Sequence, residues 1–517
     1  MHQAQVKAGA PHAYLPLLLG TFVIAVCGLV YELIAGTISS YLLGDSVFQF
    51  SIVIGLFMTA MGLGAFLSRY IESRLERAFV ATQIALGLVG GLAAPILFFA
   101  FAFVDNYEAF LVLICLTIGA LVGLEIPLVT RILQQEKTLQ INISNILTAD
   151  YIGALVAALL FPLVLVPQLG LISTSLVFGL LNLAVAGLAC RIFWPMLDWK
   201  LPLIAIAATL LLLTSLLSSH RLVGVFEGEL YQDEIIYAET TPYQRIVVTQ
   251  GRGHVRFFLN GGLQFDSVDE HRYHESLVHP AMGLTTRKNA VLILGGGDGM
   301  AVREILKHEG VKKIKLVDLD PAVTQLFREN PRLTALNDDA LNDPRVEVVH
   351  QDAFEFLKSD GELYNVILID LPDPKNPGLS KLYSLAFYTE AARHLARDGV
   401  ITTQATSPVY ARKAFWSIAE TLGAAPDPYR QDRTLSTQPY HAYIPSFGDW
   451  GFVMAGSRRL DWADIRLPDG LDFLETATLP GLIEFPSDIG RLDVEVNTLQ
   501  AHPLLKYYEE GWAKWFP

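Results

Sequence analysis

Six aspartates follow apolar stretches in the C-terminal half of the chain, where they could do chemistry together. They are Asp298, Asp318, Asp320, Asp352, Asp370 and Asp373. In parallel α/β sheets, ligands bind at the carboxyl ends of the strands. One aspartate at a strand end is more often a helix N-cap than a ligand-binding group. Acids at four strand ends, however, predict a ligand site with a negative lining.

The elements that must position these aspartates alternate between strand and helix from residue 289 onward. The strands "AVLILGG", "KIKLVDLD", "VEVVHQD", "NVILIDL" and "GVITTQA" are separated by helical stretches such as "GMAVREILKH". This alternation is typical of a parallel, doubly wound sheet with helices on both faces. Upstream, residues 221–285 contain short β-rich runs separated by "GRG" and "NGG". They predict a small antiparallel β-domain.

The glycine-rich turn "LILGGGDGM" contains a carboxylate, Asp298, where backbone N–H groups usually cradle a nucleotide. "GGGDG" fits neither the dinucleotide pattern G-x-G-x-x-G nor a P-loop. Asp318, about 20 residues after the turn, is placed to bind ribose hydroxyls, and Asp352 could accept from an adenine amino group. Asp298 would attract a ligand that ends in an ammonium and repel one that ends in a carboxylate.

These motifs together resemble the spermidine synthase (polyamine aminopropyltransferase) family. The resemblance rests on "VLILGGGDGMAVREILKH", "KLVDLD", "HQDAFEFL" and "LIDLPDP", with "PYQRIVV" and "LNGGLQFDSVDEHRYHES" upstream, and covers roughly 225–455. It implies a small β-domain and a Rossmann-like (S-adenosylmethionine-dependent methyltransferase-like) domain. It also implies aminopropyl transfer from decarboxylated S-adenosylmethionine, as co-substrate, to putrescine or a related amine, giving spermidine or a related polyamine and methylthioadenosine. No prosthetic group and no metal are expected.

The resemblance implies roles for individual residues. Asp370 matches the family's proton acceptor, and Tyr273 matches the tyrosine that assists it. Positions that match contacts to the donor nucleoside are Gln244, Asp298, Asp318, Asp352, Ala353 and Pro377. Positions that match contacts to the polyamine are His274, Asp298, Asp373, Gln264 and Tyr443. No role is implied for His254, His271 and His279.

Acid–base chemistry agrees with a base at Asp370. An alkyl ammonium has a pKa of about 10.4, so freeing its lone pair at pH 7 costs about 4.6 kcal/mol. A positioned carboxylate assisted by Tyr273 is a suitable proton acceptor, and holding amine and donor in line accelerates the reaction further. The loop "DLPDPKNP" departs from the family pattern Asp-Ser-x-Asp-Pro-x-Gly-Pro at Leu371, Pro372 and Asn376. The identity of the acceptor amine therefore stays open.

The N-terminal part of the chain is much more apolar than the rest. The 517 residues are 52% hydrophobic and 17% charged, and the excess lies in seven runs long enough to cross a hydrocarbon core about 30 Å thick. The runs are about 14–38, 47–68, 79–104, 109–130, 146–167, 171–193 and 201–219. They predict an all-α polytopic membrane domain over 1–220, followed by the β-domain over 221–285 and a Rossmann-like catalytic domain over 286–517. Each of the three cysteines falls inside a run, which excludes a disulfide framework in the catalytic part.

The charged residues are also distributed unevenly between residues 1–220 and the rest of the chain. Residues 1–220 contain 8 of the 38 Lys and Arg and 10 of the 52 Asp and Glu, which leaves a net charge of −12 on the rest. That balance disfavours nucleic acid as a partner and favours cations. Glu32, Glu125 and Asp150 lie within the apolar runs, and either pair at helix interfaces or form a site for a cationic polyamine.

The predicted topology has two solutions. All eight Lys and Arg of residues 1–220 lie in the N-terminus and the loops 69–78, 131–145 and 191–200. The positive-inside rule therefore places the N-terminus of this multi-pass cell-membrane protein in the cytoplasm. Seven spans would then put the catalytic domain outside, away from a donor normally made in the cytosol. Either one span is miscounted or the catalytic domain faces out.

Two alternatives to a membrane-integrated aminopropyltransferase remain. One is a methyltransferase that uses intact S-adenosylmethionine, which Asp298 and the pair Asp370 and Asp373 disfavour. The other is a polyamine transporter or sensor that binds without turnover, which the altered "DLPDPKNP" loop keeps open. A homo-oligomer, dimer or tetramer, is expected because the family commonly forms one.

Overall fold

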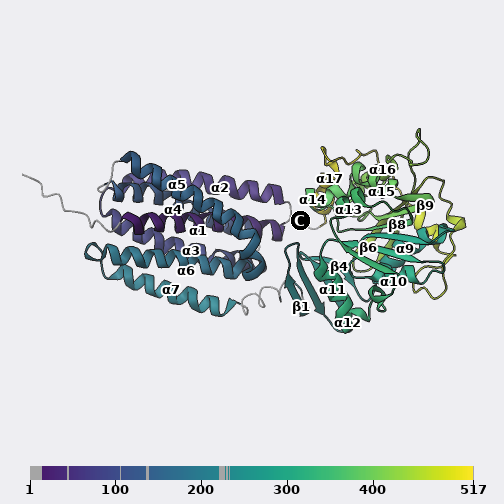
Figure 1. The fold of residues 1–517 in the computed structure, drawn as a ribbon, viewed down its shortest axis with the longest axis horizontal. Coiled ribbons are helices and arrows are strands. Elements are labelled where there is room, and N and C mark those ends of the chain that lie inside the picture. The colour runs from purple at the N-terminus through teal and green to yellow at the C-terminus, as the bar shows by residue number, and fades with distance from the viewer. Residues whose placement is uncertain are drawn as a thin grey trace, which may run out of the picture. The chain divides into compact units, whose positions relative to one another are not determined.

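The computed structural model describes residues 14–43, 46–104, 106–134, 139–219, 228, 231 and 233–515. The chain divides into two compact units, Met1–Glu234 and Ile235–Pro517. The first consists of long helices and the second of two β-sheets with their helices (Figure 1). This confirms the predicted fold classes. The predicted boundary at 220/221 lies outside the described residues.

The described part of the first unit contains seven α-helices of at least 18 residues. They are α1 (Tyr14–Leu43), α2 (Ser46–Leu67), α3 (Leu75–Phe103), α4 (Tyr107–Leu133), α5 (Leu139–Leu160), α6 (Val166–Ile192) and α7 (Lys200–Leu217). In this part of the chain, six continuous apolar segments are long enough to cross a membrane. The longest of them, Ile141–Ile192, contains both α5 and α6.

The 52-residue segment Ile141–Ile192 is not one straight helix. As one straight helix it would be ~78 Å long, more than twice the hydrocarbon thickness of a bilayer. Gly170 has the non-helical angles φ 71° and ψ 173°. The Thr174 hydroxyl donates to the Leu165 carbonyl at 3.3 Å, although nine residues of continuous helix would span ~13 Å. The chain therefore folds back near Gly170, and α5 and α6 are separate rods of the bundle (Figure 1).

Glycines allow α2 and α4 to pack closely. A Cβ on Gly64 would lie 2.0 Å from the Ala120 carbonyl oxygen, and a Cβ on Gly123 would lie 2.1 Å from the Met61 carbonyl oxygen. Small residues at such crossings let apolar helices associate through close backbone contact. The same helices expose many large apolar side chains, as expected of a bundle with an apolar surround.

The second unit begins with a four-stranded sheet. Its strands, in spatial order, are β1 (Glu234–Thr240), β2 (Arg245–Gln250), β3 (Val255–Leu259) and β4 (Gly262–Asp266). Strands β2, β3 and β4 pair antiparallel. Asn260 and Gly261, with φ of 49° and 76°, form the left-handed turn between β3 and β4. The ring of Phe257 packs edge-to-face against the ring of Phe327 in the following domain, with ring centroids 4.9 Å apart.

A seven-stranded sheet follows, in the order β10-β11-β9-β8-β5-β6-β7. Five strands are parallel: β5 (Ala290–Gly295), β6 (Lys313–Asp318), β7 (Val346–His350), β8 (Tyr364–Asp370) and β9 (Leu395–Gln404). β10 (Ser436–Ile444) and β11 (Gly448–Gly456) are antiparallel and were not predicted. Only three residues connect these two strands, which excludes a parallel crossover.

Helices cover both faces of this sheet. Val291 and Ile293 of β5 belong to one hydrophobic core and Leu292 and Leu294 to another, as the two-residue period of a strand requires. The helices are α9 (Glu270–Leu284), α10 (Met300–Leu306), α11 (Pro321–Glu329), α12 (Pro331–Thr334), α13 (Ala353–Ser359), α14 (Pro377–Ser380), α15 (Leu385–Arg393), α16 (Arg412–Gly423) and α17 (Pro503–Trp512). The strand order reverses direction at β5, so the ends of β5, β6 and β8 lie side by side.

Candidate active site

The glycine turn after β5 packs against the ends of both neighbouring strands. Gly295 has φ of 87°, and a Cβ there would lie 2.0 Å from the Asp370 carbonyl oxygen. A Cβ on Gly297 would lie 2.6 Å from Asp318 Oδ2. Only glycine permits this approach. The turn that contains Asp298 therefore adjoins Asp318 on β6 and Asp370 on β8, as the sequence predicted.

Asp370 and Tyr273 are in direct contact. The Tyr273 hydroxyl, from α9, donates to Asp370 Oδ1 at 2.7 Å. Asp370 is partly exposed, but desolvation by the surrounding protein raises its pKa. The positive charge of His274 and the hydrogen bond from Tyr273 act in the opposite direction. A carboxylate with a raised pKa takes up a proton more readily than an ordinary one.

Asp298 and His274 place opposite charges beside this pair. Asp298 is 8% exposed and accepts from the Met300 N–H at 2.9 Å. Burial raises the pKa of Asp298 to about 6, with His274 opposing and Asp370 adding to the shift. Burial alone would lower the pKa of His274, but its hydrogen bond to Glu270 and the charges of Glu270, Asp298 and Asp370 raise it to about 9.

Asp318 is held by backbone donors. The N–H groups of Gly297 and Asp320 donate to its two carboxylate oxygens, each at 3.0 Å. Burial raises the pKa of Asp318 to about 6 although these donors oppose the shift. The Gln244 amide donates to Asp320 Oδ2 at 3.1 Å. This contact brings the turn between β1 and β2 to the end of β6, where Gln244 and Asp318 are close to one another.

Asp352 is the N-cap of α13, and Ala353 is the first residue of that helix. Asp352 Oδ1 accepts from the Phe354 N–H at 2.9 Å. Its Oδ2 pairs with the Lys381 ammonium at 2.8 Å. Burial would raise the pKa of Asp352, but Lys381 and the backbone donors lower it. Lys381 was not predicted, because it directly follows the short helix Pro377–Ser380 and no motif marks it.

Asp373 lies in a second set of partners that the sequence did not reveal. The Gln404 amide donates to its Oδ1 at 3.3 Å and the Thr406 hydroxyl to its Oδ2 at 3.2 Å. Burial raises the pKa of Asp373, which Lys375 and a hydrogen bond with the Tyr508 hydroxyl oppose. Thr406 has φ of 57°, a conformation that costs a β-branched residue ~1–3 kcal/mol. Such strain at a strand end is itself a signal of function.

Gln264 and Tyr443 were predicted less directly than the other site residues. The Gln264 amide donates to the Gly262 carbonyl at 2.9 Å, and the Lys375 ammonium lies 2.9 Å from the position of a Cβ on Gly262. Gln264 therefore lies near the loop of Asp373. Tyr443 is 61% exposed, and its carbonyl accepts from Arg272, the neighbour of Tyr273, at 2.8 Å. The contact of Tyr443 with a polyamine stays a prediction.

The acids of the helical unit differ in burial. Glu125 is buried, and the Gln83 amide donates to its Oε1 at 2.6 Å. Glu32 and Asp150 are only partly buried. Among the described residues, no group of three or more His, Cys, Asp or Glu could hold a metal ion.

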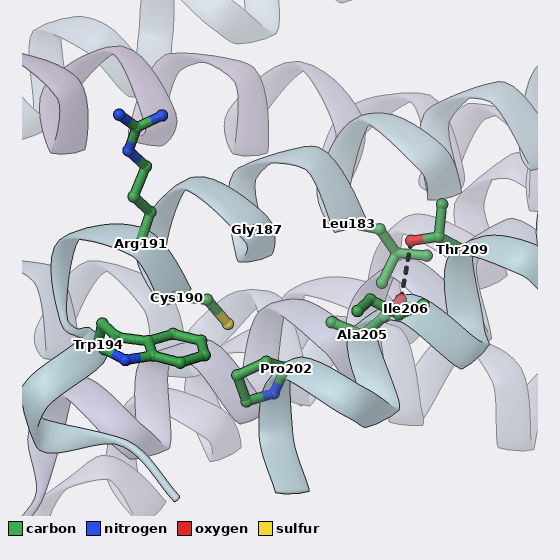
Figure 2. Close-up of a pocket in the computed structure, with 9 residues that line it drawn as sticks. All are labelled: Leu183, Gly187, Cys190, Arg191, Trp194, Pro202, Ala205, Ile206 and Thr209. Atoms are coloured by element: carbon green, nitrogen blue, oxygen red, sulfur yellow. Dashed lines mark hydrogen bonds between the residues drawn. The ribbon is translucent and has the colours of Figure 1, made fainter. Parts of the chain in front are cut away.

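A separate cavity of about 420 Å³ lies between α6 and α7. Its lining is Leu183, Gly187, Cys190, Arg191, Trp194, Pro202, Ala205, Ile206 and Thr209 (Figure 2). The Arg191 side chain points away from the other lining side chains (Figure 2). The Thr209 hydroxyl donates to the Ala205 carbonyl of its own helix at 2.8 Å. The lining contains no Asp or Glu that could bind a cationic polyamine.

Known proteins are similar in sequence to nearly the whole of this chain. Residues 270–459 match the model of the spermine/spermidine synthase domain. The polyamine aminopropyltransferase of Leptospira interrogans is 43% identical over 508 residues, which are 96% of this chain and 99% of that protein. Polyamine aminopropyltransferase 2 of Ralstonia nicotianae is 44% identical over 514 residues, with 96% and 98% covered. The chain belongs to the polyamine aminopropyltransferase family.

Membership in the aminopropyltransferase family confirms the resemblance on which the residue roles depend. The match to the synthase domain contains Tyr273, Asp298, Asp318 and Asp370 but not Tyr508. The alignments to the aminopropyltransferases also cover nearly the full length of those relatives, so the helical unit belongs to this branch of the family. A spermidine synthase structure from Thermotoga maritima aligns with 49% of this chain and 85% of its own, at 27% identity and a TM-score of 0.44.

Proposed function

We propose that this chain transfers the aminopropyl group of decarboxylated S-adenosylmethionine to a diamine such as putrescine. Family membership supports the reaction and the co-substrate, which acts without a prosthetic group. The observation that carries the assignment of roles is the contact between Tyr273 and Asp370 beside the glycine turn of Asp298. This contact places a proton acceptor next to an acid suited to an ammonium.

The donor is held at the ends of β5, β6 and β7. Asp318 binds the ribose hydroxyls, since its two oxygens are already fixed by backbone donors and each retains a lone pair. Gln244, Ala353 and Pro377 complete the nucleoside site together with Asp352. Asp298 binds the ammonium of the aminopropyl group, which intact S-adenosylmethionine would present together with a carboxylate. Repulsion between that carboxylate and Asp298 disfavours the methyltransferase alternative.

Asp370 and Tyr273 prepare the nucleophile. The acceptor's ammonium gives one proton to the Asp370 carboxylate, which the Tyr273 hydroxyl holds in place. The freed lone pair attacks the methylene carbon bonded to the sulfonium. A new C–N bond forms, the C–S bond breaks, and its electron pair neutralises the sulfur to give methylthioadenosine. The amino group at the other end of the acceptor takes no part in the reaction, so it needs only a partner of opposite charge.

Asp373 is that partner. It is buried, and its hydrogen bonds come from hydroxyl and amide groups rather than from a paired guanidinium. An acceptor with two ammonium groups therefore engages Asp370 with one end and Asp373 with the other. Gln264 and Tyr443 complete the polyamine site, and His274 lies beside it, next to the ring of Tyr273.

The experiment that tests the function is a product assay on the full chain in detergent. Decarboxylated S-adenosylmethionine is supplied with putrescine, cadaverine, spermidine or no amine, and methylthioadenosine is measured. We expect methylthioadenosine to form with a diamine and not without an amine. Binding of donor and amine without methylthioadenosine would favour the sensor or transporter alternative, and a methylated product from intact S-adenosylmethionine would favour a methyltransferase.

We further propose that the helical unit spans the cell membrane with the N-terminus in the cytoplasm. An odd number of helices and the position of the basic residues support this orientation, with the two ends of the unit on opposite sides. The catalytic unit would then face outward and receive its donor there. A C-terminal reporter that is active only in the cytoplasm should be silent, and a fluorescent cytoplasmic reporter would overturn the orientation.

Within the bundle, we propose that Glu125 forms a polyamine site together with Glu32 and Asp150. A buried carboxyl with one amide partner is an expensive group in an apolar bundle and marks a site for a cation. Glu125→Gln should weaken spermidine binding to the full chain that is measured with the catalytic site filled by donor and product. Gln49→Leu, at a buried amide that accepts from Ser39 elsewhere in the bundle, serves as the control for packing. Unchanged spermidine binding in Glu125→Gln would exclude the site.

A further inference from the structure

A row of charged side chains runs from His274 into the interior between α9 and α10. His274 Nδ1 lies 2.7 Å from Glu270 Oε2. The Arg303 guanidinium forks onto the same carboxylate, at 2.9 Å to Oε1 and 3.0 Å to Oε2. Its Nε donates to Glu304 Oε1 at 2.8 Å. The proposed reaction uses none of these partners of His274.

The row continues through two histidines to the surface. Glu304 Oε2 lies 2.9 Å from His279 Nε2, and His279 Nδ1 lies 2.9 Å from His308 Nε2. His308 Nδ1 lies 3.3 Å from the Lys288 ammonium. Because lysine can only donate, His308 accepts at Nδ1 and donates from Nε2, and His279 then donates from Nε2 to Glu304. From Lys288 inward, each hydrogen bond is therefore donated in the direction of the Glu304 carboxylate.

Charges along the row alternate in sign. Glu304 is fully buried, Glu270 is 7% exposed and His274 is 2% exposed. Burial would raise the pKa of Glu270, but the hydrogen bonds and charges of His274 and Arg303 lower it to about 2. Burial would likewise raise the pKa of Glu304, which its partners His279, Lys307 and Arg303 lower. Buried charges persist only where each has an opposite neighbour.

His274 is the end of the row that faces the catalytic acids. On α9 it meets Glu270 and the ring of Tyr273, with ring centroids 5.1 Å apart. From the turn after β5 it meets the charge of Asp298, and from β8 the charge of Asp370. The positive charge of His274 in turn favours the ionised form of both aspartates. Without it, two neighbouring acids in a desolvated site would compete for ionisation.

We propose that Glu270, Arg303, Glu304 and His279 are positioning residues that hold His274 as an imidazolium, and that this cation keeps Asp298 and Asp370 ionised before the substrates arrive. The inference rests on the proposed function for the roles of the two aspartates. The charge state of His274, however, is measurable without turnover. The network therefore serves catalysis through His274 and contacts neither substrate.

The first test measures the pKa of His274 directly in the full chain. Exchange of the histidine C2 hydrogen with deuterium, followed by mass spectrometry over a pH series, reports each histidine separately. We expect His274 to titrate near pH 9 in the unmodified protein. Glu270→Gln keeps the shape of the partner and removes its charge, so the pKa of His274 should fall by at least about one unit, a tenfold change in its ionisation equilibrium.

The second test is the pH profile of methylthioadenosine formation. Loss of the imidazolium raises the pKa of Asp370, so activity is lost at a higher pH as the solution is acidified. His274→Gln removes the imidazolium at every pH, so its acidic limb should move to higher pH. Glu270→Gln should move the limb only as far as its lowered His274 pKa leaves the imidazole uncharged on that limb. Glu304→Gln, one step further from His274, should lower the pKa of His274 in the same direction by a smaller amount.

His254→Gln is the matched control. His254 Nδ1 lies 2.9 Å from the buried Asp266 carboxylate, in an ion pair outside the row. Loss of the His254–Asp266 contact should lower the melting temperature of the protein. It should move neither the acidic limb of the pH–activity profile nor the pKa of His274. A pKa of His274 near 9 in both Glu270→Gln and Glu304→Gln would overturn the inference, as would an unmoved acidic limb in His274→Gln. If Glu270→Gln fails to fold, Glu304→Gln decides. A protein that forms no methylthioadenosine refutes the proposed function but leaves the His274 measurement intact.

Discussion

The donor and acceptor ends of the site hold their acids with different partners. At the donor end, Asp318 accepts two backbone N–H groups, and Asp352 caps α13 and pairs with Lys381. At the acceptor end, Asp370 receives a tyrosine hydroxyl, and Asp373 receives an amide and hydroxyl groups. The donor end thus relies on groups that keep a fixed charge or belong to the backbone.

This difference matches what each end must bind. The ribose and adenine are neutral, so donor-side acids act as fixed acceptors, and Lys381 lowers the pKa of Asp352. The acceptor arrives as an ammonium and must lose a proton. Asp370 and Asp373 have raised pKa values because burial opposes their charge, as it also does for Asp318 at the donor end. An incoming ammonium is a further positive partner for both carboxylates, and a base with a raised pKa accepts its proton more readily.

The strongest test of the comparison is Asp370→Asn. It should lower turnover by about 10²- to 10⁴-fold, because the amide cannot accept the proton of the acceptor. Donor affinity, measured by calorimetry without amine, should change by less than about threefold because the donor end is untouched. Turnover within about tenfold of the unmodified enzyme would contradict the assignment of Asp370 as the base.

Asp298→Asn tests the boundary between the two ends and should have the next largest effect. Asp298 faces the aminopropyl ammonium of the donor, and a hydrogen bond between charged groups contributes ~1.5–3 kcal/mol. The affinity for decarboxylated S-adenosylmethionine should therefore fall about 10- to 100-fold. The affinity for the intact compound should rise or stay unchanged, because the repulsion of its carboxylate is removed. An equal loss for both compounds would show that Asp298 acts only on the fold of the turn.

The acids at the strand ends were predictable because parallel strands bring their carboxyl ends to one edge. Asp298, Asp318 and Asp370 each follow a short apolar stretch that reads as a strand. The glycine turn then packs directly against Asp318 and Asp370. Tyr508 was not predictable, because no periodicity links a tyrosine on α17 to a loop after β8. It reaches Asp373 only through tertiary packing.

Some features of the fold could not be predicted from the sequence either, because local residue preferences do not encode them. The positive φ of Thr406 is a backbone property that its side chain disfavours, so sequence preference points away from it. The β10–β11 hairpin follows a helix as a parallel strand would, and only the short connection between its strands reveals the direction. In the helical unit, by contrast, the sequence predicted the separate runs 146–167 and 171–193, and the break at Gly170 lies between them.

Tyr508→Phe gives the smallest and most selective effect, and it isolates the acceptor end. The change removes one hydroxyl that hydrogen-bonds Asp373 and keeps the ring that packs α17. One hydrogen bond to a charged group whose other partners, Gln404 and Thr406, remain contributes ~1 kcal/mol. The KM for the diamine should therefore rise about three- to fivefold, while the KM for the donor and kcat change little. Tyr507→Phe, one position earlier on the same helix, is the matched control and should alter neither KM. Equal changes in the two KM values for Tyr508→Phe would mean that α17 supports the site as a whole, and the division into two ends would then fail.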